Sequence, residues 1–315
     1  MVIALLIVLV VALVVGLWPL RAGGLVSRPR AVDSYDEAVA RYNELTRAES
    51  GLVKPDSGSL LLGLGNRTPR AYVLIHGLTN SPLQWLELAR MLHGRGHNVL
   101  ILRLPYHGLR SSRVSELRRL RPEDLRAYAD AAVDIGAGLG DEVVVAGISG
   151  GATIAAWVAV SRSDVDRALL LAPFFGINGL SARANTLLMN LFARLPNLNF
   201  YHRFELHRAW AYRGQSSRGV AAFLRLARQV RQAAEGGIVP TGTIAVITTA
   251  TDDTANNAIT AGLLDNWRGA GVPVITYEFG PDQLIAHNSV DPAADEGKRR
   301  AVHDRILTLL GERGS

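Results

Sequence analysis

Short apolar runs alternate with amphipathic stretches from residue 71 to the end of the chain. Runs rich in Val, Ile and Leu indicate strands, and apolar residues at helical spacing indicate helices. The expected strands are "AYVLIHG", "HNVLILRLP", "EVVVAG", "DRALLLAP", "TIAVITT" and "VPVITYEF", preceded by an antiparallel strand in "SGSLLLGLG". The expected helices include "SPLQWLELARMLHGRG", "RPEDLRAYADAAVDIGAGLG", "NNAITAGLLDNWRGAG" and "GKRRAVHDRILTLLGE". This order predicts an α/β fold, with a mostly parallel sheet flanked by helices.

One interval, residues 174–240, breaks the alternation because it contains no strand-like run. It contains two helical stretches, "ANTLLMNLFARL" and "RGVAAFLRLARQVRQAAEGG". In the second stretch one face is apolar and the opposite face carries arginines. The apolar face consists of Val220, Phe223, Leu224, Ala227 and Val230. We therefore expect an all-helical insertion that divides one α/β core into residues 59–173 and 241–315.

The N-terminal 20 residues are apolar and carry no charged side chain. A helix of about 20 apolar residues spans a bilayer, and Trp18 lies where an interfacial aromatic residue is expected. We therefore predict that residues 1–20 form a single-pass membrane anchor. A cleaved signal peptide is the alternative, although the basic start is missing and "LRA", ending at Ala22, is a poor cleavage site.

The side of the membrane is left open by the charges around this segment. The basic residues Arg21, Arg28 and Arg30 follow it, which favours a cytoplasmic domain, whereas a conventional signal anchor gives the reverse orientation. Residues 21–58 are expected to form a linker and an N-terminal helix. That helix, "YDEAVARYNELTRAE", follows Ser34, which is spaced to form a capping box with Glu37.

Composition narrows the function classes. The chain has 315 residues, 48% of them hydrophobic, which is enough for one large domain. The net charge is +6, but the basic residues are spread along the chain and no zinc-finger spacing occurs, so we expect no nucleic-acid partner. There is no cysteine, which excludes disulfides, thiolate metal sites and a cysteine nucleophile. We predict no metal site and no cofactor.

The stretch "VVVAGISGGATIAAW" carries the first chemical signal. Gly147, Ser149 and Gly151 form a G-x-S-x-G pattern between an expected strand and an expected helix, which is the setting of a nucleophile elbow. The sharp turn holds the serine hydroxyl clear of the sheet, and small neighbours let the strand and the helix approach closely. Ser149 is therefore the candidate nucleophile.

A serine needs a base, and the base needs an orienting acid. The strand "AVITT" is followed by Asp252 and Asp253, and His287 lies in the loop after the next strand. His287 comes 35 residues after Asp252, which leaves room for one helix and one strand between them. We predict that His287 is the base and that one of the two aspartates orients it.

An oxyanion site is expected in the loop that follows the first parallel strand. The loop "HGLTNSP" begins at His76, and its turn can aim a backbone amide at the carbon that Ser149 attacks. We predict the N–H groups of Leu78 and Gly150 as the two donors. His76 and His107 lie in early loops where roles other than the catalytic base fit.

Taken together, these segments resemble the α/β-hydrolase superfamily, and "HGLTN", "GISGG" and "AHNSVDP" resemble its carboxylesterase and monoacylglycerol-lipase branch. The resemblance covers about residues 59–312. It implies an α/β-hydrolase fold in which residues 174–240 form a helical lid over an acyl pocket. In that branch the acid precedes an apolar residue by three positions, which favours Asp252, followed by Ala255, over Asp253.

Two positions depart from the pattern of that branch. Gly150 stands where a larger side chain is common, so the local pocket shape is expected to differ. In "RLPYHG", Arg103 and Tyr106 replace an acidic residue and a glycine, so this loop does not name a substrate.

The function predicted from these residues is that of a membrane-anchored serine hydrolase acting on a small-molecule or lipid-like carboxylic ester. Ser149 attacks, His287 transfers the proton, Asp252 orients the imidazole, and Leu78 and Gly150 hold the oxyanion. A peptidase, thioesterase or amidase would use the same triad, and a non-catalytic ligand-binding protein on this fold is the alternative outside the enzymes.

Overall fold

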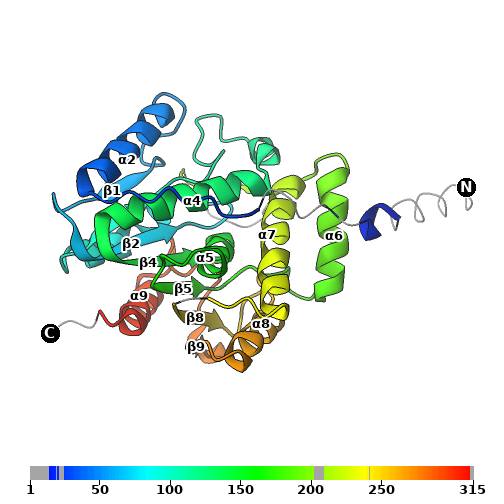
Figure 1. The fold of residues 1–315 in the computed structure, drawn as a ribbon. Helices are drawn as coiled ribbons and strands as arrows, with labels where there is room; N and C mark the ends of the chain where they lie inside the picture. Colours follow the sequence, from blue (N-terminus) through cyan, green and yellow to red (C-terminus); the bar gives the residue numbers. More distant parts are fainter. Residues whose placement is uncertain (1–13, 19, 21–24, 202–208, 241, 313–315) are drawn as a thin grey trace, which may run out of the picture.

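The computed structural model describes residues 14–18, 20, 25–201, 209–240 and 242–312. Its centre is a seven-stranded sheet in the order β1-β3-β2-β4-β5-β8-β9 (Figure 1). Its strands are β1 (Leu60–Leu62), β2 (Thr68–Ile75), β3 (Asn98–Ile101), β4 (Gly140–Ile148), β5 (Arg167–Leu171), β8 (Thr243–Thr249) and β9 (Val274–Phe279). The edge strand β1 runs antiparallel to β3, and the remaining pairs are parallel, as predicted.

Helices cover both faces of the sheet because its strands are apolar on both sides. In β2, Val73 and Ile75 pack into one core, whereas Tyr72 and Leu74 pack into the other, following the two-residue period of a strand. The first core is covered by α4 (Pro122–Leu139), α5 (Gly150–Ser161) and α8 (Asn257–Gly269). The second is covered by α3 (Leu86–His93) and α9 (Glu296–Leu310). The short helices η1 (Pro82–Trp85), η2 (Val114–Arg119) and η3 (Pro281–Gln283) lie in connecting segments.

The predicted N-terminal helix is α2 (Tyr35–Glu49), which packs against α4. The Ser34 hydroxyl caps it by accepting a hydrogen bond from the Glu37 N–H at 3.3 Å, as is usual for serine at this position. The reciprocal bond of a capping box is replaced, because the Glu37 carboxylate accepts a bond from Arg41 at 3.4 Å. The cap is therefore one-sided, unlike the capping box that the spacing predicted.

The insertion contains two strands as well as two helices, so the expectation that it is all-helical was wrong. Its elements are α6 (Ala182–Arg194), β6 (Asn199–Tyr201), β7 (Gly214–Ser216) and α7 (Ser217–Glu235). The strands β6 and β7 pair antiparallel over three residues, and every residue of β6 is exposed. A strand so short, with no buried face, shows no hydrophobic alternation from which to predict it.

The helix α7 lies between α5 and α6 (Figure 1). The five residues of its predicted apolar face are all buried. Phe223 and Ala227 are completely inaccessible to solvent. This helix is therefore part of the central core of the molecule.

The predicted anchor lies mainly on residues outside the described part of the chain. Residues 14–17 of this segment are helical, and two of their backbone carbonyls accept hydrogen bonds from side chains of α6. The Asn190 side chain donates a hydrogen bond to the Gly16 carbonyl at 2.6 Å, and Arg194 donates one to the Val15 carbonyl at 3.1 Å. Among the described residues, no helix combines the length and the apolar character needed to cross a membrane.

Candidate active site

Ser149 lies at the sharp turn where β4 ends and α5 begins. Its backbone has φ 56° and ψ −118°, a strained combination for a residue with a side chain. The neighbouring loop holds this conformation: the Ser149 N–H donates to the Leu171 carbonyl at 2.9 Å, and its carbonyl accepts from the Phe174 N–H at 3.2 Å. The strain is thus supported on both sides, as expected where a fold fixes a side chain for chemistry.

The two flanking glycines are required by space. A Cβ atom on Gly151 would lie 2.2 Å from the Ile75 carbonyl oxygen. A Cβ atom on Gly147 would lie 2.2 Å from the Gly151 carbonyl oxygen. The helix and the strands therefore approach as closely as the G-x-S-x-G pattern implied.

The structure brings together Ser149, Asp252 and His287 from the ends of three strands. The His287 Nε2 atom lies 2.8 Å from the Ser149 hydroxyl oxygen. Its Nδ1 atom lies 2.7 Å from Oδ2 of Asp252. Because the carboxylate can only accept, Nδ1 carries the proton, which leaves the Nε2 lone pair facing the serine hydroxyl. This arrangement suits removal of a proton from Ser149.

Asp252, and not Asp253, points toward the histidine. The second oxygen of the Asp252 carboxylate accepts hydrogen bonds from the N–H groups of Thr254 and Ala255, both at 2.8 Å. Asp253 is exposed and accepts a bond from the Thr254 hydroxyl. The backbone turn therefore selects which of the two adjacent carboxylates faces inward.

The hydrogen bonds to Asp252 also keep it ionised. Burial alone would raise the pKa of this carboxyl, but the bond from His287 and the two backbone N–H bonds outweigh it, so the pKa lies below its usual value. The side chain is fully buried. A fixed negative charge beneath the imidazole favours its protonated form during proton transfer.

The predicted oxyanion donors are both available. In the described part of the chain, neither the Leu78 N–H nor the Gly150 N–H donates a hydrogen bond. The loop of Leu78 passes close to the nucleophile, because a Cβ atom on Gly77 would lie 3.6 Å from the Cβ of Ser149. Two free amides beside a nucleophile can stabilise negative charge on a substrate oxygen.

Buried His76 fixes the direction of the Leu78 amide. Its Nε2 atom accepts a hydrogen bond from the Leu104 N–H at 3.1 Å, so Nδ1 carries the proton. That Nδ1 atom lies 2.9 Å from the Gly77 carbonyl, which belongs to the same peptide group as the Leu78 N–H. Burial, together with nearby His107, holds the pKa of His76 well below its usual value, so the ring remains neutral.

A second buried histidine, His107, contacts the carbonyl of Leu78 through Nε2. Burial lowers its pKa to about 4. From the sequence, His76 and His107 were expected in early loops where roles other than the catalytic base fit, and no contact of either ring was predicted. The signal that could have identified them is the histidine–glycine pair, which occurs after both β2 and β3.

Arg103 and Tyr106, which depart from the pattern of the lipase branch, help to hold the loop that contains His107. Arg103 donates to the His107 carbonyl at 2.8 Å and pairs with Glu49 of α2 at 3.0 Å. Tyr106 has φ 66°, which lies in the left-handed region that favours glycine. This conformation accounts for the glycine that is usual at this position in the lipase branch. The Tyr106 carbonyl accepts a hydrogen bond from the Tyr212 hydroxyl at 2.8 Å, so the insertion is tied to this loop.

A cavity of about 440 Å³ opens at Ser149. Its walls come from the oxyanion loop and from the loops of Asp252 and His287, and it includes charged groups. The charged residues that line it are Asp253, Asp295 and Lys298. The cavity therefore connects the nucleophile with these three charged residues.

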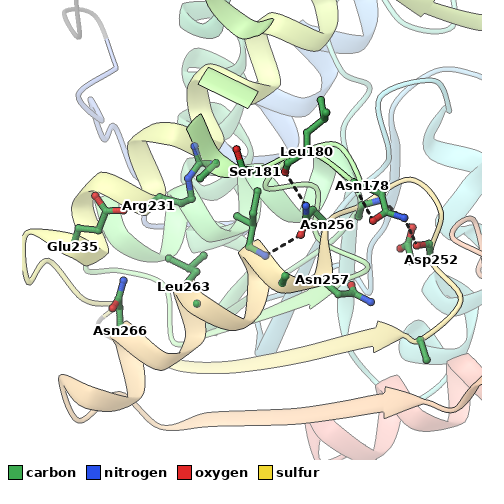
Figure 2. Close-up of a pocket in the computed structure, with 17 residues that line it drawn as sticks. Asn178, Leu180, Ser181, Arg231, Glu235, Asp252, Asn256, Asn257, Leu263 and Asn266 are labelled. Carbon is green, nitrogen blue, oxygen red and sulfur yellow. Dashed lines mark hydrogen bonds between the residues drawn. The ribbon is translucent and has the colours of Figure 1, made fainter. Parts of the chain in front are cut away.

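A larger cavity of about 790 Å³ lies between the β5–α6 loop, α7 and α8 (Figure 2). Asp252 lines this cavity, whereas Ser149 and His287 line only the smaller one. Asn178, which also lines the larger cavity, donates through its side-chain amide to the Asp252 carbonyl at 3.1 Å (Figure 2). The larger cavity is therefore separated from the nucleophile by the acid loop. Within the described ranges, no three His, Asp or Glu side chains are grouped to hold a metal ion.

Solved structures with a similar fold include several lipolytic enzymes. A structure from a study of the metagenome-derived lipolytic enzymes LipS and LipT is 15% identical, with a TM-score of 0.62, covering 83% of this chain and 100% of the other. A monoacylglycerol lipase from Paleococcus ferrophilus is 16% identical, with a TM-score of 0.57, covering 79% and 98%. A soluble variant of monoglyceride lipase from Saccharomyces cerevisiae is 11% identical, with a TM-score of 0.55, covering 82% and 92%. At these identities the likeness establishes the fold alone.

A search of curated proteins found no match. The model of the alpha/beta hydrolase family, in contrast, matches residues 72–311. That segment contains the serine elbow, the acid loop and the histidine loop, together with five complete strands of the sheet and half of β2. This chain therefore belongs to the alpha/beta hydrolase family.

Proposed function

We propose that this protein is a serine hydrolase that cleaves carboxylic esters through an acyl-enzyme. The observation that carries the proposal is the pair of contacts made by His287, 2.8 Å to the Ser149 hydroxyl and 2.7 Å to the Asp252 carboxylate. Both distances are within the hydrogen-bond reach that proton transfer requires.

In the proposed reaction, the Ser149 oxygen attacks the ester carbonyl carbon while its proton passes to Nε2 of His287. The carbonyl oxygen becomes negatively charged and is held by the N–H groups of Leu78 and Gly150. When the ester C–O bond breaks, His287 returns the proton to the departing alcohol. Water then attacks the acyl-enzyme with His287 again as the base, which releases the carboxylic acid and regenerates Ser149.

The alternatives differ in how well the geometry supports them. A non-catalytic binding protein would have no need of a serine in strained conformation with a histidine 2.8 Å away, so the contacts favour the enzyme. A peptidase, thioesterase or amidase would use the same residues. A panel of matched ester, thioester and amide substrates with one acyl group separates these classes, and we expect the ester to react fastest.

The experiment that tests the proposal compares Ser149→Ala with the native protein on short p-nitrophenyl esters. We expect the variant to lose at least about 10³-fold in kcat, because the nucleophile is absent. Ser161→Ala, at the other end of the same helix, is the matched control and should hydrolyse the ester at close to the native rate. Undiminished hydrolysis by Ser149→Ala would refute the proposal.

We also propose that residues 1–20 anchor this enzyme in a membrane. The support is the uncharged apolar sequence of residues 2–20, which has about the length that a helix needs to span a bilayer. N-terminal sequencing of protein extracted from membranes tests this directly. We expect a chain that begins at the N-terminal Met, and a chain that begins near Gly23 would instead indicate a cleaved signal peptide.

A further inference from the structure

Gly150 lies directly beneath an aromatic ring of the insertion. A Cβ atom on Gly150 would lie 2.7 Å from Cε1 of Phe223 and 2.9 Å from its Cδ1. Gly150 is the first residue of α5 and has no positive φ, so its backbone conformation does not demand glycine. The glycine is required by space alone, because the Phe223 ring occupies the volume of a side chain at this position.

Phe223 is held firmly in this place. Its side chain is completely buried, and it belongs to the apolar face by which α7 packs against α5. Two further bonds fix the same helix: Trp157 of α5 donates to the Gln229 side chain at 3.1 Å, and Arg231 donates to the Phe175 carbonyl at 2.5 Å. Moving the ring would require α7 to leave the core, so Phe223 is a fixed wall.

The cavity at Ser149 opens away from this wall. Among the described residues, no member of α6 or α7 lines it, and the insertion contributes only Phe174 and Gln215. The opposite side is formed by the segment from Leu284 to Lys298, which includes His287. Open space beside the nucleophile is therefore found on the histidine side.

The proposed reaction assigns the two ends of the substrate to these two sides. The departing alcohol must lie at Nε2 of His287, which protonates it, and the carbonyl oxygen must lie at the amides of Leu78 and Gly150. The remaining substituent of the carbonyl carbon is the acyl chain, which therefore extends away from His287. The Phe223 ring packs on Gly150, the residue that supplies one of these two amides.

We infer that Phe223 sets the length of the acyl group and restricts this enzyme to esters of short carboxylic acids, with the alcohol in the cavity beside Lys298. The inference rests on the proposed ester hydrolysis. Gly150 and Phe223 act as a pair, because the Phe223 ring occupies the space that a side chain at position 150 would need. The pair fills the volume that a long acyl chain would need next to the oxyanion amides.

The test is kcat/KM for p-nitrophenyl acetate, butyrate, octanoate and dodecanoate. We expect native butyrate hydrolysis to exceed dodecanoate hydrolysis by about 100-fold or more, since a filled pocket rejects added methylenes. In Phe223→Ala this ratio should fall by about tenfold or more. Leu226→Ala, at an equally buried position of α7, is the matched control and should keep the native ratio.

Thermal unfolding of each variant separates a change in specificity from a loss of fold. If Phe223→Ala does not fold, Phe223→Leu retains an apolar side chain and should shift the ratio in the same direction by a smaller factor. Equal native rates on butyrate and dodecanoate, or an unchanged ratio in both Phe223 variants, would overturn the inference. Absence of hydrolysis for every ester, together with no labelling by a fluorophosphonate, would instead overturn the proposed function.

Discussion

Ser149 has unlike surroundings on its two sides. On the side of His287, loops after β8 and β9 border an open cavity with charged residues. On the side of Gly150, the helix α7 is packed against α5 and leaves no room even for a methyl group. The first side has the features of a place where a substrate group enters and leaves, and the second has those of a protein core. On this side the insertion packs against the residue that follows the nucleophile, and the lid over an acyl pocket that the resemblance implied stays a prediction.

The largest effect is expected on the open side, from removal of the acid. Asp252→Asn keeps the shape of the side chain but cannot hold His287 in the tautomer that accepts the serine proton, so we predict a loss of about 10³- to 10⁴-fold in kcat. Asp253→Asn is the matched control because the Asp253 carboxylate bonds to the Thr254 hydroxyl rather than to His287, and it should lose less than about tenfold. Steady-state ester hydrolysis measures both, and the reverse ranking would assign the acid to Asp253.

On the closed side the expected effect is on stability. Gly150→Ala places a methyl group against the Phe223 ring, and overpacking of this kind costs about 1–3 kcal/mol. Phe223→Ala alone leaves a cavity and costs about 3–5 kcal/mol. The double variant should cost less than the sum of the two, because each change relieves the other. Urea unfolding measures this cycle, and strict additivity would mean that the two positions are not in contact.

The buried histidines behind the oxyanion loop predict a dependence of stability on pH. The pKa of His107 is lowered by burial to about 4, compared with about 6.5 in an unfolded chain, so below about pH 6.5 the unfolded state binds more protons. Stability from this group is therefore complete at pH 7 and is lost as the pH falls from about 6.5 toward 4. At pH 5 the loss is about 2 kcal/mol.

Urea unfolding at pH 7 and pH 5 checks this dependence. His107→Gln removes the titrating ring, so the variant should lose less stability than the native protein between these two pH values. His303→Gln removes a second buried histidine whose pKa is also lowered by burial to about 4, on the other face of the sheet. It serves as a matched comparison and should reduce the pH dependence by a similar amount without touching the oxyanion loop. An unchanged pH dependence in His107→Gln would show that this ring binds protons equally in the folded and unfolded states, which would contradict the lowered pKa.

The alternation of strands and helices could be predicted because both faces of the central strands are buried, which makes these strands almost continuously apolar. The grouping of Ser149, Asp252 and His287 could also be predicted. Each residue follows a parallel strand, and the loops that follow parallel strands lie at the same edge of the sheet. The choice of Asp252 over Asp253 rested on a resemblance. In the structure it depends on a backbone turn in which the N–H groups of Thr254 and Ala255 donate to the Asp252 carboxylate, and the sequence pattern does not show this turn.

The remaining features depend on contacts between distant parts of the chain. Helical periodicity placed Phe223 on the apolar face of its helix but gave no information about its contact with Gly150, 73 positions earlier. The role of His76 depends on the Leu104 N–H, which fixes its tautomer. The pairing of β6 with β7 has no hydrophobic signal, because β6 is exposed throughout.

Mass spectrometry of the protein after reaction with a fluorophosphonate identifies the nucleophile itself. We predict one adduct, on the peptide that contains Ser149, formed at the same rate as ester hydrolysis is lost. Prior heat unfolding should abolish labelling, since the reactivity depends on the folded contacts with His287 and Asp252. An adduct on another serine that accounts for the lost activity, or full loss of activity without any adduct on Ser149, would contradict the assignment of Ser149 as the nucleophile.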